Sequence, residues 1–416
     1  MSGSAPGRGV ELGLRENWLQ FSLLVIVNIC VGGLVGLERT TVPLIGTEVF
    51  GITSDLAVFS FIIAFGVTKA FTNLAAGALT ARFRRKQLLL AGWIVGVPVP
   101  FMLAWGPSWG WIVAANVLLG LNQGLAWSMT VNMKIDLVGP KQRGLATGLN
   151  EAAGYAAIGG TALLTGFLAT SYGLRPVPEL IGVVFVVAGL GLSLVSVDTA
   201  DHVALELSRH PRPAPAEGSG LRTVFARTTW GEPSLRGASQ AGLVNNLNDG
   251  LTWGVFPLLF TDYGLGLAAV GLIKGLYPLL WGVGQIYTGH LADRVGRKPL
   301  IVYGMFVQAA GFALALGLLR WPLLAGVASA VALGIGTAMV YPALIAVVSD
   351  HAHPGWRPNA LGTYRFWRDF GYAAGALVGG VIADWLGLNA AVVAAGIITA
   401  LSGLLAARWI TEVSRS

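Results

Sequence analysis

Residues 289–298 read Gly-His-Leu-Ala-Asp-Arg-Val-Gly-Arg-Lys, and residues 77–86 read Gly-Ala-Leu-Thr-Ala-Arg-Phe-Arg-Arg-Lys. Each stretch is a short basic segment between two apolar runs, and the two begin 212 residues apart. Gly148 and Gly362 are separated by a closely similar 214 residues. Because the chain has 416 residues, this spacing predicts two halves of the same design.

The chain around these segments is too apolar for a soluble protein. It is 54% hydrophobic and 11% charged, whereas soluble domains are about 25% charged. Apolar runs of about 18 residues or more are typical of membrane helices. We predict twelve spans, at residues 18–44, 55–79, 87–105, 110–133, 144–170, 177–197, 237–261, 266–289, 299–319, 322–349, 359–385 and 389–409.

The basic residues give these spans an orientation. Most of the 27 Lys and Arg residues fall on one side of the predicted spans, and only Arg175 and Arg320 fall on the other. Cytoplasmic loops carry the excess of Lys and Arg, so both termini are predicted to be cytoplasmic. The formal charge of +7 is therefore a result of topology and does not indicate a nucleic-acid partner. The polar first fifteen residues favour a cytoplasmic tail over a cleaved signal peptide.

A long polar stretch near the middle of the chain separates six spans from six. Its Pro- and Ala-rich centre, around His210, is typical of a mobile linker. The predicted organisation is an N-terminal tail at 1–17, a six-helix bundle at 18–197, a linker at 198–236, a second six-helix bundle at 237–410 and a tail at 411–416.

The segment from Gly289 to Lys298 resembles a known signature. It matches the loop Gly-x-Leu-Ala-Asp-Arg-x-Gly-Arg-Lys of the major facilitator superfamily, at the place where that family has it, between spans 8 and 9. The first-half copy departs from it, with Ala81 for the Asp and Arg84 for the second Gly. The chain is similar to this family from about Trp18 to Trp409. The resemblance implies an all-α membrane protein of two pseudo-symmetric six-helix bundles that works by alternating access, with its substrate site between the halves.

The two loops are also candidates for a cytoplasmic latch between conformations. Asp293 can lie beside a helix N-terminus and pair with a neighbouring Arg, and Gly289 can allow close helix contact. The alternative is that these charges only set the topology, and Ala81 leaves the first-half latch without its Asp. The predicted latch residues are Gly77, Arg82, Arg85, Gly289, Asp293, Arg294 and Arg297.

Nine charged residues lie within the predicted spans. A charge at the centre of a bilayer costs at least about 2.5–3.5 kcal/mol, so we expect these side chains to face a polar internal cavity. They are Glu38, Arg39, Lys69, Glu151, Asp249, Lys274, Arg365, Arg368 and Asp369.

Span 1 contains a candidate for proton coupling. Glu38 precedes Pro43 within a long apolar run, and many members of the resembled family have an acid at a similar depth. The alternative is a structural pair between Glu38 and Arg39. The other predicted proton-coupling residues are Glu151, Asp249 and Asp369.

Span 11 has the densest cluster of charges. Arg365 and Asp369 are four residues apart and can pair along one helix face. Arg368 is then left for an anionic substrate group, because Arg binds carboxylate and phosphate in a bidentate manner. The alternative is an interhelical salt bridge from Arg368 to an acid on another span.

Polar and aromatic residues with helical spacing complete the predicted cavity. Lys274, Tyr277 and Trp281 share a face of span 8, and Asn245 and Trp253 flank Asp249 on span 7. The residues expected to line the cavity are Arg39, Lys69, Gln123, Trp127, Tyr155, Asn245, Asn246, Trp253, Lys274, Tyr277, Trp281, Tyr341, Tyr364, Arg365, Arg368 and Tyr372.

Several motifs are missing. The span-4 Arg of proton antiporters in the resembled family falls on Gly120, and the Gly-Pro signature of span 5 is not evident. Cys30 is the only cysteine, and no Walker sequence is present. We find no pair of a nucleophile and a base and no metal spacing. The sequence predicts no cofactor, no metal and no enzymatic activity.

These observations predict a secondary active transporter of a small organic solute in a bacterial cytoplasmic membrane. Five basic and four acidic residues within the spans favour an anionic or zwitterionic solute, and the comparison with small bacterial members favours proton-coupled export. The alternatives are proton-coupled uptake of an anionic metabolite, a multidrug efflux antiporter, and a lipid flippase or a transport-inactive sensor. Its predicted partners are the solute, protons and membrane lipids, with the protein a monomer.

Overall fold

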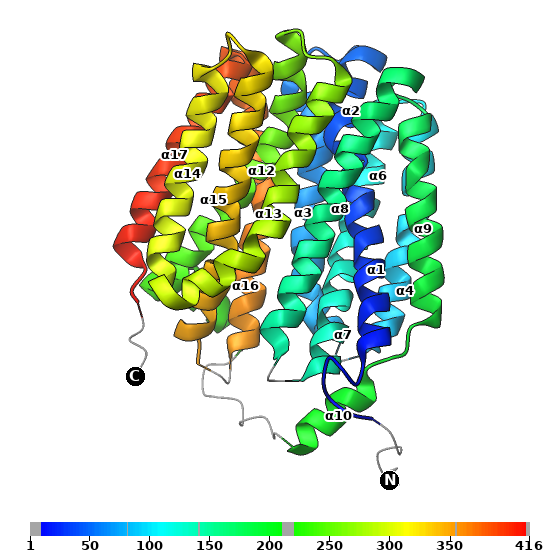
Figure 1. Ribbon diagram of the computed structural model, residues 1–416, viewed down its shortest axis with the longest axis vertical. Coiled ribbons are helices and arrows are strands. Elements are labelled where there is room, and N and C mark those ends of the chain that lie inside the picture. Colours follow the sequence, from blue (N-terminus) through cyan, green and yellow to red (C-terminus); the bar gives the residue numbers. More distant parts are fainter. Residues whose placement is uncertain (1–9, 81, 140–141, 210–219, 354–355, 413–416) are drawn as a thin grey trace.

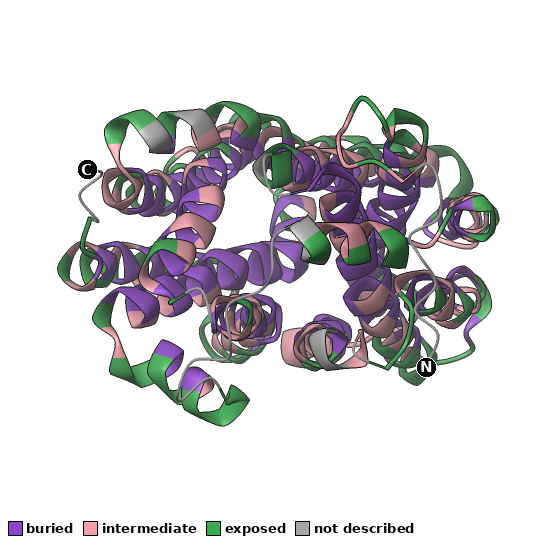
Figure 2. Ribbon diagram, turned by 90° about the horizontal axis from the view of Figure 1, so that it is seen from below, coloured by how far each residue is buried: buried purple, intermediate pink, exposed green. Residues whose placement is uncertain are grey.

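The computed structural model describes residues 10–80, 82–139, 142–209, 220–353 and 356–412. Every regular element within these ranges is a helix. Figure 1 shows long helices that run side by side along the longest axis of the molecule. Figure 2, a view along them, shows buried residues toward the middle of the bundle and exposed ones around its surface.

The first half of the chain forms six helical spans, three of which are interrupted. The first span consists of α1 (Trp18–Gly36), α2 (Glu38–Leu44) and η1 (Ile45–Val49), and the second is α3 (Asp55–Leu79). The third consists of α4 (Arg85–Gly96) and α5 (Val99–Trp105), and the fourth of α6 (Trp109–Asn122), η2 (Gln123–Trp127) and α7 (Ser128–Val138). The fifth and sixth are α8 (Arg143–Tyr172) and α9 (Val177–Val195).

The second half forms six further long helices. They are α12 (Pro233–Asp262), α13 (Leu267–Val295), α14 (Arg297–Gly317), α15 (Pro322–His351), α16 (Arg357–Leu386) and α17 (Leu388–Trp409). Within the described residues, ten stretches are long and apolar enough to cross a membrane. The helices α12 and α16 are not among them, because Asn, Asp and Arg residues interrupt their apolar sequence.

The stretch predicted as a mobile linker contains helices, so that description was incomplete. It forms α10 (Ala200–Arg209), α11 (Leu221–Ala226) and the short η4 (Arg227–Gly231). Residues 210–219, the Pro-rich centre, lie outside the described ranges. In Figure 1, α10 lies across one end of the bundle, near the start of α1. We call this the α10 end and the opposite one the distal end.

The internal repeat extends to helix contacts. A Cβ atom at Gly36 would lie 2.6 Å from the carbonyl oxygen of Ile158, and one at Gly250 would lie 2.5 Å from that of Tyr372. Each glycine and its contact are separated from their counterparts by the same 214 residues. Small residues allow helix backbones to approach this closely. The same glycine contact therefore joins the first span to the fifth and the seventh to the eleventh.

The two halves meet along two helix pairs, α8 with α13 and α3 with α16. At the distal end the carboxylate of Asp384 accepts hydrogen bonds from the Ser54 hydroxyl (2.7 Å) and the backbone N–H of Asp55 (2.6 Å). At the α10 end, a Cβ atom at Gly148, Gly289 or Gly362 would meet nothing within 4 Å. The halves are therefore closed together at the distal end, and the expected close helix contact at Gly289 is wrong for this conformation.

Gly159 allows us to test the contact between the halves. Its Cβ would lie 2.4 Å from the Gly275 carbonyl oxygen, whereas a Cβ at the adjacent Gly160 would meet nothing within 4 Å. We expect Gly159→Ala to destabilise the protein by about 1–3 kcal/mol through overpacking. The matched control, Gly160→Ala, should be neutral or slightly stabilising, because Ala favours helix. Thermal unfolding in detergent measures both, and equal stabilities would contradict the described contact.

Candidate functional site

A small internal cavity lies where the two halves meet. Its volume is about 20 Å³, which is room for about one water molecule. Side chains from α3, η2, α7, α8, α15 and α16 surround it. The lining residues are Lys69, Asn73, Trp127, Ser128, Glu151, Tyr155, Tyr341, Arg365, Arg368 and Asp369.

Asp369 is the centre of the ionic contacts in this cavity. Its carboxylate lies 3.9 Å from the Lys69 ammonium and 3.5 Å from the Arg368 guanidinium. It also accepts a hydrogen bond from the Asn73 side-chain amide. The predicted pair between Arg365 and Asp369 is not formed. Asp369 instead pairs with the adjacent Arg368 and, across the interface between the halves, with Lys69.

Arg368 joins the two halves through its guanidinium. It donates a 2.5 Å hydrogen bond to the Tyr155 hydroxyl on α8. Its guanidinium carbon also lies 4.1 Å from the centre of the Tyr341 ring and 5.6 Å from that of Trp281. A guanidinium is stabilised over aromatic faces at these distances. Tyr155 in turn stacks on Trp281 with ring centres 3.5 Å apart, so the Arg is held from several sides.

Arg365 is partly exposed and lines the same cavity. Among the residues that the structure describes, no carboxylate lies within 4.0 Å of its guanidinium. Three cationic side chains and two carboxylates line the cavity. The cavity therefore carries an excess of positive charge, and Arg365 can bind an anion without breaking an ion pair.

Glu151 is held by neutral donors. Its carboxylate accepts hydrogen bonds from the Trp127 indole (2.8 Å), the Tyr341 hydroxyl (3.1 Å) and the Asn150 amide (3.2 Å). Tyr341 belongs to the other half of the chain. Any movement that separates α8 from α15 must break this contact, which makes Glu151 sensitive to the conformation of the protein.

Three of the nine predicted charges form a separate polar group nearer the distal end. Arg39 of α2 forms a bidentate pair with Asp249 of α12, with its second contact at 3.1 Å. Lys274 donates to the Thr252 carbonyl oxygen at 2.9 Å. These charges do not line the cavity, so the single cavity predicted from the sequence is corrected to two polar groups. The alternative pair between Glu38 and Arg39 is also not formed.

Other predicted residues have roles within the helix packing. Gln123 donates to the Val31 carbonyl oxygen at 2.8 Å, and Asn245 accepts from Gln308 at 3.0 Å. The π-helical turn at Gln123–Trp127 changes the register, so Trp127 lines the cavity and Gln123 does not. The predicted residues that do not line the cavity are Glu38, Arg39, Gln123, Asn245, Asn246, Asp249, Trp253, Lys274, Tyr277, Trp281, Tyr364 and Tyr372. Tyr372 and Trp281 nevertheless contact residues of its wall, by ring contacts with Lys69 and Tyr155.

Sequence reasoning missed four residues. Asn73 and Ser128 line the cavity and bond to each other at 2.7 Å, but a lone Asn or Ser in a span is a weak signal. Glu179 and Lys134 are both fully buried. Glu179 lay at the start of a predicted span and Lys134 just beyond the end of one, so neither was counted as a membrane charge.

Two of the predicted latch residues, Arg85 and Arg297, take part in a repeated clamp at the α10 end. Arg85 pairs with Asp136 at 2.6 Å, and its repeat counterpart Arg297 pairs with Asp350 at 2.5 Å. The clamp fastens α4 to α7 and α14 to α15, within each half. Arg82 and Arg294 are exposed. Ala81 and the side chain of Asp293 lie outside the described part of the chain, as does the environment of Gly77.

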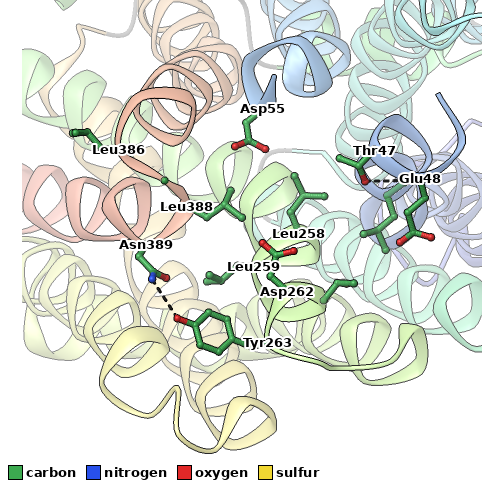
Figure 3. Close-up of a pocket in the computed structure, with 13 residues that line it drawn as sticks. Thr47, Glu48, Asp55, Leu258, Leu259, Asp262, Tyr263, Leu386, Leu388 and Asn389 are labelled. Atoms are coloured by element: carbon green, nitrogen blue, oxygen red, sulfur yellow. Dashed lines mark hydrogen bonds between the residues drawn. The ribbon is translucent and has the colours of Figure 1, made fainter. Parts of the chain in front are cut away.

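A larger cavity of about 500 Å³ lies at the distal end (Figure 3). The acidic residues Glu48, Asp55 and Asp262 line it, together with leucines of α12 and of the α16–α17 connection. The Asn389 amide donates to the Tyr263 hydroxyl at 3.3 Å along one side. Its described lining contains no Lys or Arg. The distal cavity, which residues of both halves also line, is therefore acidic, whereas the small cavity lined by Arg365 and Arg368 has a positive excess.

The comparison with protein families follows the two halves of this fold. The sequence model of the Major Facilitator Superfamily matches residues 23–237 and again 238–416. The chain belongs to the Major Facilitator Superfamily. That superfamily consists of membrane transporters, and the ten long apolar stretches of the described residues indicate a multi-pass membrane protein.

Individual relatives are similar to this superfamily member over shorter stretches. Inner membrane transport protein YajR of Escherichia coli (strain K12) is 32% identical over 170 residues, which is 39% of this chain and 34% of that protein. Multidrug resistance protein MdtH of Yersinia enterocolitica is 39% identical over 137 residues, which is 32% of each. The chain thus matches about a third of the length of these curated relatives.

A solved structure supports the same fold for this superfamily member. The crystal structure of a POT family transporter in complex with a thioalcohol-conjugated peptide has a TM-score of 0.71 to this chain. It covers 92% of this chain and 94% of that one at 12% sequence identity. At this identity the similarity concerns the fold alone.

Proposed function

We propose that this protein is a proton-coupled secondary transporter that exports a small anionic or zwitterionic solute across a bacterial inner membrane. The α10 end is the cytoplasmic end in this proposal, and the organisation into two bundles of six spans follows the sequence boundaries given above. The substrate binds between the halves, in an enlarged form of the cavity lined by Arg365 and Arg368. The protein works as a monomer.

Arg365 carries this proposal. It lines the cavity between the halves, and no described carboxylate lies within 4.0 Å of it. A cation in a low-dielectric site is costly unless it is paired, so an anionic group of the substrate stabilises it. Arg368 lies one helix turn away and can bind the same group, because guanidinium groups recognise carboxylate and phosphate in a bidentate manner.

The distal cavity supports export as the direction. If the halves separate at the distal end, an anionic substrate leaves past Glu48, Asp55 and Asp262. Like charges disfavour the return of the released anion along this path. The name of the relative MdtH, a multidrug resistance protein, is also in keeping with export.

The acidic distal cavity also favours a second candidate function, efflux of a cationic drug. In that case Glu48, Asp55 and Asp262 attract the solute. The positive excess of the small cavity lined by Arg365 and Arg368 opposes its binding. The two candidates differ in the charge of the solute, so a flux experiment separates them.

Flux in proteoliposomes tests the proposed function. With an imposed pH gradient, we expect the purified protein to move labelled organic anions or zwitterions, and a protonophore to abolish the movement. Liposomes without protein give the background. Movement of lipophilic cations alone would support the second candidate, and no flux of any class would contradict a transport role.

Glu38→Gln should flatten the pH dependence of this flux. Glu38 is fully buried beside the Arg39–Asp249 contact between the halves, and a glutamine there keeps the shape but cannot exchange a proton. We expect wild-type flux to vary between about pH 5.5 and pH 8 as the carboxyl group gains or loses its proton, and the variant to vary little. Glu16→Gln, at an exposed site, serves as the control. An unchanged pH profile in the Glu38 variant would remove it as the coupling site.

A further inference from the structure

Two buried carboxyl groups on the first and sixth spans have no cationic partner. Glu38 of α2 and Glu179 of α9 each have an exposed fraction of 0%. Among the described residues, no Lys, Arg or His nitrogen lies within 4.0 Å of either carboxylate. One oxygen of each, Oε2, lacks any hydrogen-bond partner. Burying an unpaired carboxylate is among the most costly arrangements in a protein.

The hydrogen bonds of Thr41 indicate where a proton lies. Its hydroxyl oxygen is 3.0 Å from the Leu37 carbonyl oxygen and 2.6 Å from Glu179 Oε1. A threonine hydroxyl has one hydrogen to donate and can also accept. The Leu37 carbonyl can only accept, and the one hydroxyl hydrogen cannot be donated to both oxygens, so both contacts are satisfied only when Thr41 donates to Leu37. The short contact with Glu179 is then satisfied if a proton on Glu179 is donated to the Thr41 oxygen.

Glu38 has an equivalent deficit of donors. Its Oε1 accepts a 3.2 Å hydrogen bond from the Asn116 amide nitrogen, which also donates to the Ile112 carbonyl oxygen at 3.1 Å. The Asn116 oxygen Oδ1 and Glu38 Oε2 are both buried acceptors without a donor. A proton on Glu38 provides a hydrogen-bond donor at a place where two acceptor oxygens, Glu38 Oε2 and Asn116 Oδ1, have none. Glu38 and Thr41 are three residues apart on α2, so Glu38 and the Thr41–Glu179 contact share one face of that helix.

We propose that Glu38 and Glu179, which are linked through α2 and the contact of Thr41 with Glu179, form one proton-binding site inside the first half, outside the small cavity lined by Arg368. This proposal rests on the proposed function, because it assigns the coupling proton to this pair. Glu179 holds its proton against Thr41, and Glu38 holds its own beside Asn116. The solute and the proton then occupy separate sites and do not compete for the same side chains.

The described cationic side chains around the pair each have another partner. Arg39 pairs with Asp249, and Lys274 of α13 donates to the Thr252 carbonyl oxygen. Arg175, which precedes α9 at the distal end, donates to the Gly106 carbonyl oxygen at 3.0 Å. Its side chain is partly exposed.

The pair is connected to the interface between the halves by the backbone and side chains of α2. The Trp253 indole of α12 donates to the Glu38 carbonyl oxygen at 3.2 Å, and the next residue, Arg39, pairs with Asp249. Loss of the proton from Glu38 creates a carboxylate adjacent to Arg39. This carboxylate competes with Asp249 for the guanidinium, which weakens a contact that holds the halves together.

Infrared difference spectroscopy of the purified protein in liposomes tests the site without substrate. A protonated carboxyl group absorbs in a carbonyl-stretch region that is separate from that of a carboxylate. We expect the wild type to show protonated-carboxyl absorption at about pH 5.5, where an ordinary glutamate is mostly ionised. Glu38→Gln and Glu179→Gln should each remove part of it, and the double variant should remove both parts.

Two further variants make the assignment specific. Thr41→Val removes the hydroxyl and should shift the Glu179 part of the band while leaving the Glu38 part in place. Glu16→Gln, at an exposed carboxyl, should leave the spectrum unchanged in this range. A spectrum unaffected by Glu179→Gln and by Thr41→Val would overturn the proposal.

The infrared measurement does not depend on whether the protein moves solute. A protein that shows the expected bands but moves no solute would retain the proton site and contradict the proposed function. A protein that moves solute with unchanged pH dependence in Glu179→Gln, and lacks the bands, would retain the proposed function and overturn the proton site.

Discussion

Arg368→Ala is expected to abolish solute flux while leaving the protein folded. The guanidinium joins Tyr155 of the first half to Asp369 of the second, and it lines the cavity proposed for the substrate. Truncating a buried hydrogen-bonded charge costs about 2–5 kcal/mol, and each 1.4 kcal/mol is about a factor of ten. We therefore expect flux to fall by about 30-fold to 4,000-fold.

The fold is expected to survive this change because no acid is left isolated. Asp369 keeps its contacts with Lys69 and Asn73. Arg368→Lys keeps the charge without the planar fork and should recover only part of the flux. Arg408→Ala, at an exposed site on α17, serves as a matched control. Wild-type flux in the Arg368→Ala protein would rule out the proposed binding role.

Arg39→Leu is expected to have the largest effect on stability. It leaves Asp249, which is 2% exposed, without its bidentate partner. Breaking a buried ion pair by removing one partner costs about 3–5 kcal/mol. Thermal unfolding in detergent should show this as a large drop in the midpoint. Because Arg39 and Asp249 belong to different halves, we also expect the distal end to separate more readily.

The double variant Arg39→Leu/Asp249→Asn distinguishes an isolated charge from lost packing. It removes the uncompensated carboxylate, so we expect it to recover most of the stability lost in Arg39→Leu. If the double variant is as unstable as the single one, the loss arises from packing against Trp253, whose ring centre lies 4.2 Å from the guanidinium. That result would contradict an ionic contact between the halves.

Much of the fold is evident from the sequence because lipid imposes a strong constraint. A spanning helix must satisfy its backbone groups internally and present apolar side chains to the bilayer, so the spans can be read as apolar runs. The repeat of residues 77–86 and 289–298 then divides the chain into halves. The helices within the linker were missed because α10 is short and polar, and its boundaries are not fixed by lipid.

The site was harder to predict because the positions of charged residues in the sequence do not determine which helix faces contact each other. Arg365 and Asp369 have the spacing of an ion pair on one helix face. The Asp369 carboxylate instead pairs with Lys69 and accepts a hydrogen bond from Asn73 of α3. Those contacts are between residues about 300 positions apart in the chain, and local periodicity contains no information about them. Glu179 was overlooked because Glu near the end of a predicted span is ordinarily solvated, whereas here it is fully buried against Thr41.

The most direct test of the central claim is ligand-induced thermal stabilisation of the wild type and of Arg365→Ala, side by side. A ligand that binds the native state raises its apparent stability by mass action. We predict that organic anions or zwitterions stabilise the wild type, and that Arg365→Ala loses this stabilisation while its own unfolding midpoint stays near that of the wild type. Equal stabilisation of both proteins, or stabilisation by lipophilic cations alone, would contradict a positively charged substrate site between the halves.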